Sequence, residues 1–291
     1  MHQRSSLKLC QLGTSAAVVL ASLFISTPAT AEQDIVFGIV PQQSASRLAQ
    51  NWVPVFDHLS EKADARIRFA TAKDIPTFEA CLARGAYDLA YMNPYHYTTF
   101  HKLAGYEAFA RQTEKRLRGL IVVRADSSYG QLEELDDQSI AFPSPAAFGA
   151  SVIPRAEMKS RAMTIRPAYV KSHDSVYRAV IAGLFPAGGG VLRTFNNVPE
   201  AERSKLRVLY RTDAYTPHAF AAHPRMEKSL VADLMETMTD LAKDRPGLLK
   251  AIGMQGIQQA SDADWNDVRA LRLTRNQTQI EISDQVACHS G

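Results

Sequence analysis

Cysteine is scarce in this chain of 291 residues, which contains three. Cys10 lies near the N-terminus, and Cys81 and Cys288 are too few for the disulfide scaffold of a small secreted domain. Cys81 falls in a helical stretch, where a small core residue is the simplest explanation. A bond between Cys81 and Cys288 is compatible with an oxidising compartment, and the sequence leaves this question open.

The chain also lacks a marked excess of either charge. It has 33 Lys and Arg residues against 30 Asp and Glu residues, and loss of residues 1–31 would lower the formal charge from +3 to +1 by removing Arg4 and Lys8. A nearly neutral protein has no bulk attraction to nucleic acid or to an anionic membrane, so we expect no nucleic-acid partner. No apolar run after residue 31 is long enough to span a bilayer.

Familiar catalytic and metal-binding motifs are missing from the sequence. It has no Gly-x-Ser-x-Gly elbow and no His-Glu-x-x-His pattern, and residues 188–190 lack the spacing of a phosphate-binding loop, which favours close backbone packing instead. His173 and Asp174 supply parts of a hydrolase triad without a positioned nucleophile. We therefore expect no enzymatic activity, no cofactor and no metal, and a periplasmic hydrolase is the least favoured alternative.

The N-terminus has the pattern of a secretory signal peptide. A basic start with Arg4 and Lys8 precedes an apolar run at residues 16–25, and residues 29–31 form an Ala-x-Ala cleavage site. Cys10 precedes the apolar run, whereas a lipid-modified cysteine would follow it. We expect residues 1–31 to be removed and the mature protein to be soluble and periplasmic.

The rest of the chain alternates between strand and helix patterns. Apolar strands are predicted at residues 34–40, 66–70 and 87–92, and helices with one apolar face lie between them. A second cycle follows residues 126–130, and the last part is chiefly helical. This order predicts an α/β fold with mainly parallel sheets flanked by helices, in one large domain or two smaller ones.

Polar residues gather where the predicted strands end. The strand at residues 87–92 stops at a loop that contains Asn93 and Tyr95, and the first strand is followed by Ser44 and Ser46 at a helix start. The serines either cap that helix or receive an anion. Such positions form small-molecule sites in open α/β sheets.

Four segments in a consistent order carry a family resemblance. Residues 37–41, 87–92, 172–176 and 260–265 together resemble the periplasmic phosphate, phosphite and phosphonate-binding proteins of ABC importers. The resemblance implies a type II periplasmic binding fold, with two lobes that close on a ligand. It places the crossovers near residues 123–126 and 209–213, lobe one at residues 32–124 plus 212–291, and lobe two at residues 125–211.

The resemblance also implies a set of ligand-binding residues. Family members hold the oxyanion with a Ser-Thr-Ser-Gly run at a helix start, whereas residues 144–151 here lack those hydroxyls and offer backbone N–H groups. His173 matches the family's ligand-facing histidine. The full predicted set, from both lobes and the second crossover, is Ser44, Ser46, Asn93, Tyr95, Ala147, Phe148, Gly149, His173, Asp213 and Tyr215.

These features predict an exported solute-binding protein that captures a small oxyanion or a phosphonate-like compound. Its partners would be this small-molecule ligand and an ABC permease, and we expect a monomer. The alternative is a periplasmic sensor in which a membrane sensor kinase reads the same closure. The sequence does not separate these two roles.

Overall fold

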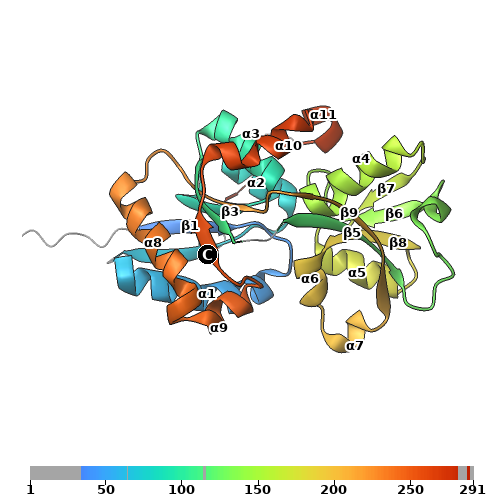
Figure 1. The fold of residues 1–291 in the computed structure, drawn as a ribbon, viewed down its shortest axis with the longest axis horizontal. Helices are drawn as coiled ribbons and strands as arrows, with labels where there is room; N and C mark the ends of the chain where they lie inside the picture. The colour runs from blue at the N-terminus through green and yellow to red at the C-terminus, as the bar shows by residue number, and fades with distance from the viewer. Residues whose placement is uncertain (1–33, 64, 114–115, 281–286, 289–291) are drawn as a thin grey trace, which may run out of the picture. The chain divides into compact units, whose positions relative to one another are not determined.

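Two β-sheets organise the part of the chain that the computed structural model describes, residues 34–63, 65–113, 116–280 and 287–288 (Figure 1). The predicted signal peptide at residues 1–31 lies outside these residues. Each sheet is flanked by helices, as the alternating pattern predicted. No described helix is long and apolar enough to cross a membrane.

The first sheet has the strand order β11-β4-β10-β3-β1-β2. The parallel pairing expected for the first three strands is confirmed, since β1 pairs in parallel with β2 and β3. Antiparallel strands that the pattern did not predict complete the sheet. Its strands are β1 (Asp34–Ile39), β2 (Arg66–Ala70), β3 (Leu89–Met92), β4 (Glu107–Gln112), β10 (Ala219–Ala222) and β11 (Ile257–Gln259).

Helix α2 follows the sequence signal that predicted it, whereas α3 occupies residues 94–104, where the sequence predicted a loop after the strand that ends at Met92. Asp74 caps α2, since its Oδ1 accepts a hydrogen bond of 2.9 Å from the N–H of Thr77, and Gly105 ends α3 with a φ of 75°. The helices that follow strands of this sheet or form the C-terminal part are α1 (Ala45–Ala63), α2 (Ile75–Ala83), α3 (Pro94–Ala104), α8 (Lys228–Asp244), α9 (Pro246–Ala251), the 3-10 turn η3 (Asp262–Trp265), α10 (Asn266–Ala270) and α11 (Arg275–Thr278).

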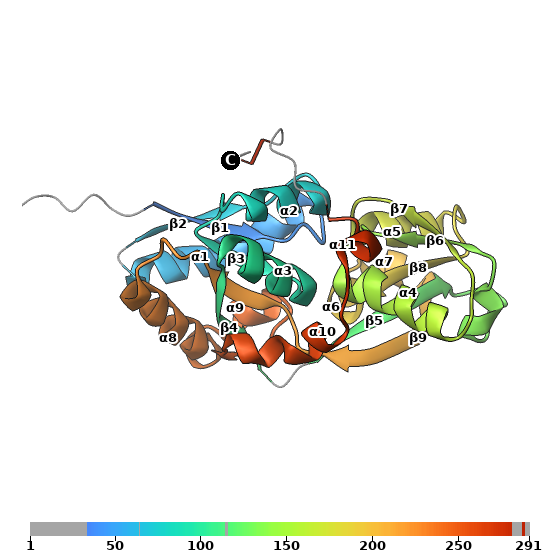
Figure 2. The same cartoon turned by 90° about the horizontal axis from the view of Figure 1, so that it is seen from above.

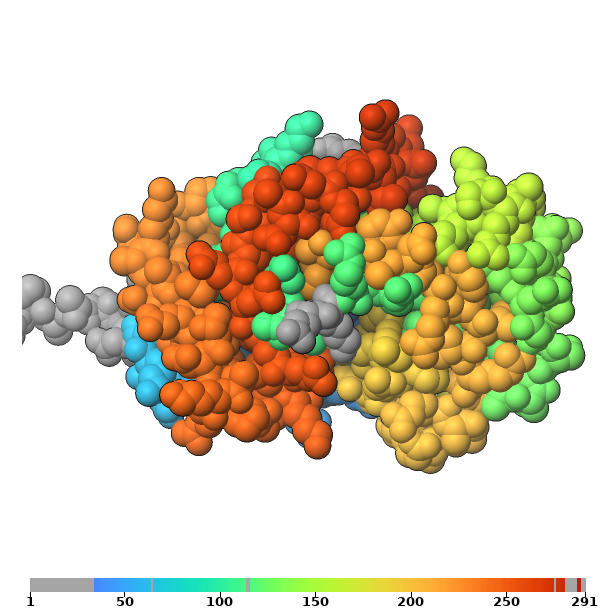
Figure 3. Space-filling model, viewed as in Figure 1, coloured from blue at the N-terminus to red at the C-terminus, as the bar shows by residue number. Residues whose placement is uncertain are grey.

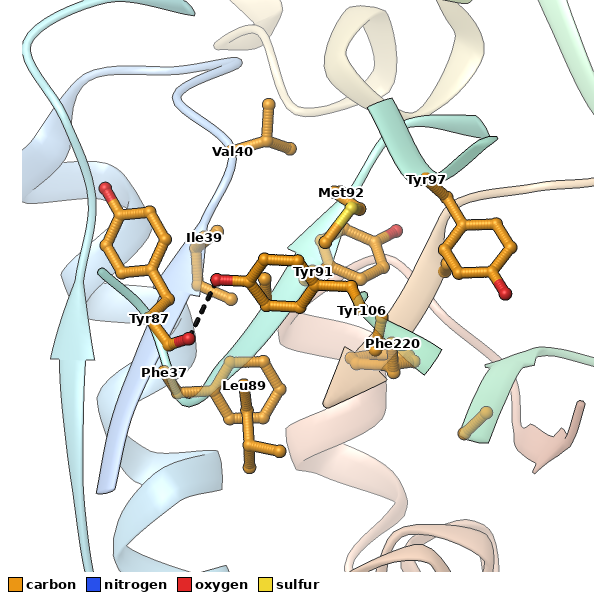
Figure 4. Packing of buried hydrophobic residues seen from close by; sticks show 14 of the residues in the cluster. Phe37, Ile39, Val40, Tyr87, Leu89, Tyr91, Met92, Tyr97, Tyr106 and Phe220 are labelled. Atoms are coloured by element: carbon orange, nitrogen blue, oxygen red, sulfur yellow. Dashed lines mark hydrogen bonds between the residues drawn. The ribbon is translucent and has the colours of Figure 1, made fainter. Parts of the chain in front are cut away.

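Aromatic side chains fill the core beside this sheet. Trp52 of α1 lies 5.1 Å from the ring of Tyr91, and Tyr91 lies 4.7 Å from Phe220. The buried Tyr106 hydroxyl donates to the carbonyl oxygen of Tyr87 at 2.8 Å (Figure 4). Because these buried rings come from α1, from β3 and β10 and from the residues just before β3 and β4, they hold neighbouring strands of the sheet together.

The second sheet has the order β7-β6-β8-β5-β9. Strand β6 pairs in parallel with β7 and β8, and β5 pairs antiparallel with β8 and β9. Its strands are β5 (Leu117–Arg124), β6 (Ser139–Phe142), β7 (Arg166–Tyr169), β8 (Ala187–Val191) and β9 (Leu206–Tyr215). Its helical segments are η1 (Leu132–Leu135), the π-helical turn η2 (Phe148–Val152), α4 (Ile153–Ser160), α5 (His173–Ile181), α6 (Leu192–Asn196) and α7 (Glu200–Arg203).

The chain passes between the sheets at positions that differ from the expected crossovers. Strand β5 begins at Leu117 and already belongs to the second sheet, and β9 stays in that sheet to Tyr215. The first expected crossover, residues 123–126, therefore begins at the end of β5. The second, residues 209–213, lies inside β9. The long antiparallel β5–β9 pairing explains the difference, and the division into lobes at residues 124 and 211 remains a prediction.

A disulfide joins Cys81 of α2 to Cys288, which answers the question that the sequence left open. The bond spans 207 residues of sequence and holds the described residues 287–288 beside α2, where Figure 2 shows them as a short red piece. A cross-link over so long a loop restricts the unfolded chain strongly, and native disulfides typically add about 2–4 kcal/mol to stability. In α11, the Thr278 hydroxyl donates to the Tyr95 hydroxyl of α3 at 3.1 Å.

Candidate functional site

Strand ends from both sheets meet around one small cavity. It contains about 240 Å³ of space not filled by protein atoms, including open solvent. Its lining comes from the segments that follow β1, β3 and β6, the starts of α2 and α5, the end of β8 and the residue before β10. Carboxyl ends of strands are where open α/β sheets place their ligands. The lining residues are Val40, Gln42, Ile75, Asn93, Ala147, Phe148, Gly149, Ala150, His173, Val191 and His218.

Asn93 connects the first sheet to the second at this cavity. Its Oδ1 accepts a hydrogen bond of 2.8 Å from the N–H of His96, which caps α3. Its amide nitrogen donates to the carbonyl oxygen of Ala146 at 3.2 Å. The side chain is 3% exposed, so both bonds form away from bulk water. Asn93 therefore holds the start of α3 and the loop after β6 together.

Residues 147–150 present backbone to the cavity because glycines let the chain lie directly on the second sheet. A Cβ on Gly189 would lie 1.9 Å from the carbonyl oxygen of Ala150, and one on Gly119 would lie 2.1 Å from that of Gly149. This confirms close backbone packing at Gly189, whereas Gly188 and Gly190 are packed against the side chains of Val176 and Tyr177. The N–H groups of Ser151 and Val152 both donate to the Ala147 carbonyl, so those of residues 148–150 lie in the opening turn, without an intrahelical partner.

His173 begins α5 and is 1% exposed. Its Nδ1 lies 2.9 Å from the Thr194 hydroxyl, and its backbone N–H donates to the carbonyl oxygen of Gln42 at 3.1 Å. Burial, with a smaller effect of the Arg193 guanidinium, lowers the pKa of His173 to about 3. The imidazole is therefore neutral at physiological pH.

Asp174, the neighbour of His173, is not arranged as the acid of a catalytic triad. Its Oδ2 accepts from the N–H of Ser44 at 3.3 Å, and its Oδ1 lies 3.9 Å from Arg47. His173 bonds to a threonine hydroxyl rather than to this carboxylate. Asp174 thus joins α5 to the start of α1 instead of orienting the histidine. No cluster of three or more potential metal ligands occurs among the described residues.

Gln42 and His218 complete the polar part of the lining. The Gln42 amide nitrogen donates to Nε2 of His218 at 3.1 Å, and its Oε1 accepts from Arg193. The His218 ring stacks on Tyr91 with centroids 5.1 Å apart. Burial, followed by the Arg193 charge, holds the pKa of His218 well below its ordinary value, so this ring is neutral as well.

Five residues of the predicted set line this cavity and five do not. Asn93, Ala147, Phe148, Gly149 and His173 belong to its lining. Ser44 and Ser46 are exposed, with their hydroxyls 3.4 Å apart. The remaining three have other contacts: Tyr95 accepts from Thr278, Asp213 donates its N–H to Glu157, and Tyr215 packs edge-on against Phe148.

Gln42 and His218 were absent from the predicted set. Gln42 directly follows a predicted strand and a proline, a position from which a polar side chain can reach a ligand site. The sequence analysis instead assigned the ligand contacts of this loop to Ser44 and Ser46. His218 precedes β10, and that short strand was not predicted. Its position beside Asn93 depends on antiparallel pairing between strands far apart in sequence.

These features define the class of the molecule, a two-lobed α/β protein whose paired sheets enclose a small-ligand cavity between strand ends. Residues 37–265 match the family model of the phosphonate ABC transporter periplasmic substrate-binding proteins. The match covers most of the chain, and the chain belongs to this family. Members of the family are periplasmic solute-binding proteins of transporters.

Solved structures share the fold at low sequence identity. A binding protein component of an ABC phosphonate transporter from Pseudomonas aeruginosa superimposes with a TM-score of 0.77 at 14% identity, covering 88% of this chain and 90% of that one. PhnD1 from Prochlorococcus marinus, in complex with methylphosphonate, gives the same score and identity, with 86% and 99% covered. An ATP-bound protein from Xanthomonas citri gives a TM-score of 0.64 at 16% identity, with 85% and 98% covered. The two-lobed periplasmic binding protein fold is thereby confirmed.

Proposed function

We propose that this chain captures a small phosphorus oxyanion, such as an alkylphosphonate, in the cavity between the two sheets and delivers it to the permease of an ABC importer. The observation that carries the proposal is the lining itself: it contains residues 148–150, whose N–H groups lie in the opening turn of η2, and two neutral histidines, and none of the described Asp or Glu residues belongs to it. Donors without a nearby negative charge favour an anionic ligand.

The oxyanion would be bound mainly by backbone. The N–H groups of residues 148–150 open a helical segment that continues through α4, and the helix dipole adds to their attraction for negative charge. This arrangement replaces the hydroxyl run of the resembling proteins. The amides of Asn93 and Gln42 lie in the same lining and would contribute side-chain donors.

His173 would act as a neutral donor. The Thr194 hydroxyl lies 2.9 Å from Nδ1 and 3.1 Å from the Val191 carbonyl oxygen, and in the proposed tautomer the hydroxyl donates to Nδ1 and the imidazole proton is on Nε2. An N–H at Nε2 suits an anionic oxygen. The apolar part of the lining, formed by Val40, Ile75 and Val191, would accommodate an alkyl group on phosphorus.

Ligand binding would stabilise the closed form, because groups from both sheets contribute to one lining. We propose that residues 1–31 direct export to the periplasm and are then removed. N-terminal sequencing of the periplasmic protein tests this cleavage, since a mature chain beginning at Glu32 is expected and retention of residues 1–31 contradicts it.

Binding is tested with a thermal-shift and titration-calorimetry panel of methylphosphonate, phosphite, phosphate, methanesulfonate, arsenite and amino acids. A ligand at about 100 times its dissociation constant should add roughly 2.7 kcal/mol to the free energy of unfolding. At least one phosphorus oxyanion is expected to give this stabilisation. A panel in which only amino acids or sulfonates bind would overturn the assignment.

The site is tested with Asn93→Asp, which keeps a capping oxygen for α3 and replaces the amide donor by a negative charge. We expect phosphonate affinity to fall at least about tenfold, because the carboxylate repels the anion and cannot donate to Ala146. Asn266→Asp makes the same change on an exposed residue of α10 and should leave affinity unchanged. Equal affinities for the two variants would place the ligand elsewhere.

A further inference from the structure

A second, larger cavity adjoins the proposed oxyanion site. It contains about 560 Å³ of space not filled by protein, including open solvent, and it shares Val191 and His218 with the smaller cavity. Arginines are its most frequent lining residue: Arg116, Arg118, Arg193 and Arg211. We call this cavity the arginine vestibule. Figure 3 shows the start of β5, in green, beside the gold and orange segments that contain α6 and β9.

Most of the positive charge in the vestibule is not neutralised by the described residues. Arg116 pairs with Asp267 at 2.8 Å. Arg118 donates to the carbonyl oxygen of Thr212 at 2.8 Å, which holds the guanidinium without cancelling its charge. Within the described part of the chain, no carboxylate forms an ion pair with Arg118, Arg193 or Arg211. Three cations facing one cavity are unusual in a protein whose charges otherwise nearly balance.

Arg193 links the two cavities. Its guanidinium donates to Oε1 of Gln42, a residue of the smaller cavity, and lies 5.3 Å from the centroid of the Tyr91 ring, which lines the vestibule. These contacts fix Arg193 at the junction. A ligand group that extends out of the smaller cavity past His218 would therefore meet this cation first.

The lining of the arginine vestibule also indicates which ligand groups it disfavours and which it suits. Among the described residues no Asp or Glu lines either cavity, and Asp267, the carboxylate next to the vestibule, is already paired with Arg116, so an amino group on the ligand would meet guanidiniums rather than a described counter-charge. Apolar side chains, including Leu117, Leu192 and Pro217, form part of the lining and suit a short hydrocarbon linker. Guanidinium groups match the planar oxygens of carboxylates and the oxygens of phosphates.

We propose that the ligand is bifunctional: a phosphorus oxyanion in the smaller cavity joined by a short apolar linker to a second anionic group, a carboxylate or a second phosphorus oxyanion, held by Arg118, Arg193 and Arg211. This inference rests on the proposed function and narrows its ligand class. The second group supplies specificity, because a simple alkylphosphonate leaves these guanidiniums without an anionic partner.

Calorimetry with three matched probes tests the proposal on the full mature protein: propylphosphonate, 3-phosphonopropionate and 2-aminoethylphosphonate. We expect 3-phosphonopropionate to bind at least 30-fold more tightly than propylphosphonate, and 2-aminoethylphosphonate to bind more weakly than both. Equal affinities for the first two would overturn the second anionic site and leave the proposed oxyanion function intact. Failure of every phosphorus probe would overturn the proposed function itself.

Variants test whether the arginines cause the expected difference in affinity between 3-phosphonopropionate and propylphosphonate. Arg211→Gln changes an exposed residue and should reduce the affinity ratio of 3-phosphonopropionate to propylphosphonate about tenfold, whereas Arg211→Lys should retain part of it. Arg166→Gln removes one exposed cation from β7, outside both linings, and should leave the ratio unchanged. An equal loss in Arg211→Gln and Arg166→Gln would indicate a general charge effect and overturn the assignment. Succinate binding as tightly as 3-phosphonopropionate would overturn the requirement for phosphorus.

Discussion

His173 shows how one buried side chain makes the stability of the folded protein depend on pH. The folded protein lowers its pKa to about 3, whereas an unfolded histidine titrates near 6.5. As pH falls below about 6.5, the unfolded chain takes up a proton that the folded protein does not bind. The contribution of this residue to stability is therefore complete above pH 6.5 and is lost progressively toward pH 3.

This reasoning predicts a stability slope that a substitution reduces. Between pH 6 and pH 4 the free energy of unfolding should fall by about 1.4 kcal/mol per pH unit for each such histidine. His173→Gln should lower the number of protons taken up on unfolding by about one. The contribution of His218 to the slope should remain, since its pKa is also lowered in the folded protein. Urea denaturation at several pH values measures the slopes, and identical slopes for both proteins would contradict the prediction.

At the scale of elements, the contact between β8 and η2 positions the backbone donors of the site. Gly189→Ala places a methyl group against the carbonyl oxygen of Ala150 and the ring of Phe142. Because the first contact is backbone, η2 must shift. We expect a loss of stability of about 1–3 kcal/mol and weaker anion binding.

The matched control for this element is Gly247→Ala. A Cβ at Gly247 meets nothing within 4 Å, and the residue lies in helix α9, where alanine is favoured over glycine. Thermal unfolding of both variants and calorimetry with methylphosphonate provide the comparison. A Gly189→Ala protein with unchanged melting temperature and affinity would show that η2 does not depend on this contact.

At the scale of the whole molecule, several contacts join the two sheets beyond the site. Arg47 of α1 donates to the carbonyl oxygen of Asn197 at 3.0 Å and lies 3.9 Å from Asp174. Arg155 of α4 donates to the carbonyl oxygen of Gln277 at 3.3 Å in the C-terminal segment. These bonds bridge parts of the chain that carry different sheets, so they favour the closed arrangement.

Arg47→Ala should therefore weaken ligand binding, although Arg47 does not line the proposed ligand site. The lost bridge is worth about 0.5–1.5 kcal/mol, which corresponds to a two- to tenfold lower affinity, expressed mainly as faster dissociation. Arg66→Ala removes an exposed arginine of β2 and serves as the control. Stopped-flow dissociation rates decide the question, and equal rates for both variants would show that Arg47 does not contribute to closure.

Much of this architecture was predictable because its signals are local. The helix after Asp74, the strand that ends at Asn93 and the close packing of the β8 glycines each follow from neighbouring residues. The antiparallel strands β4, β10 and β11 were missed, since short strands depend on partners distant in the chain.

The sequence by itself determined the fold class, the family and the loops from which a ligand site is built, because apolar periodicity, capping residues and ordered motifs are properties of adjacent residues. Only the tertiary structure decided which side chains meet. It placed Gln42 against His218, bonded Cys81 to Cys288 and gathered arginines from three separate segments around one vestibule. These contacts join residues far apart in the chain, so strand order, register and packing in space determine them.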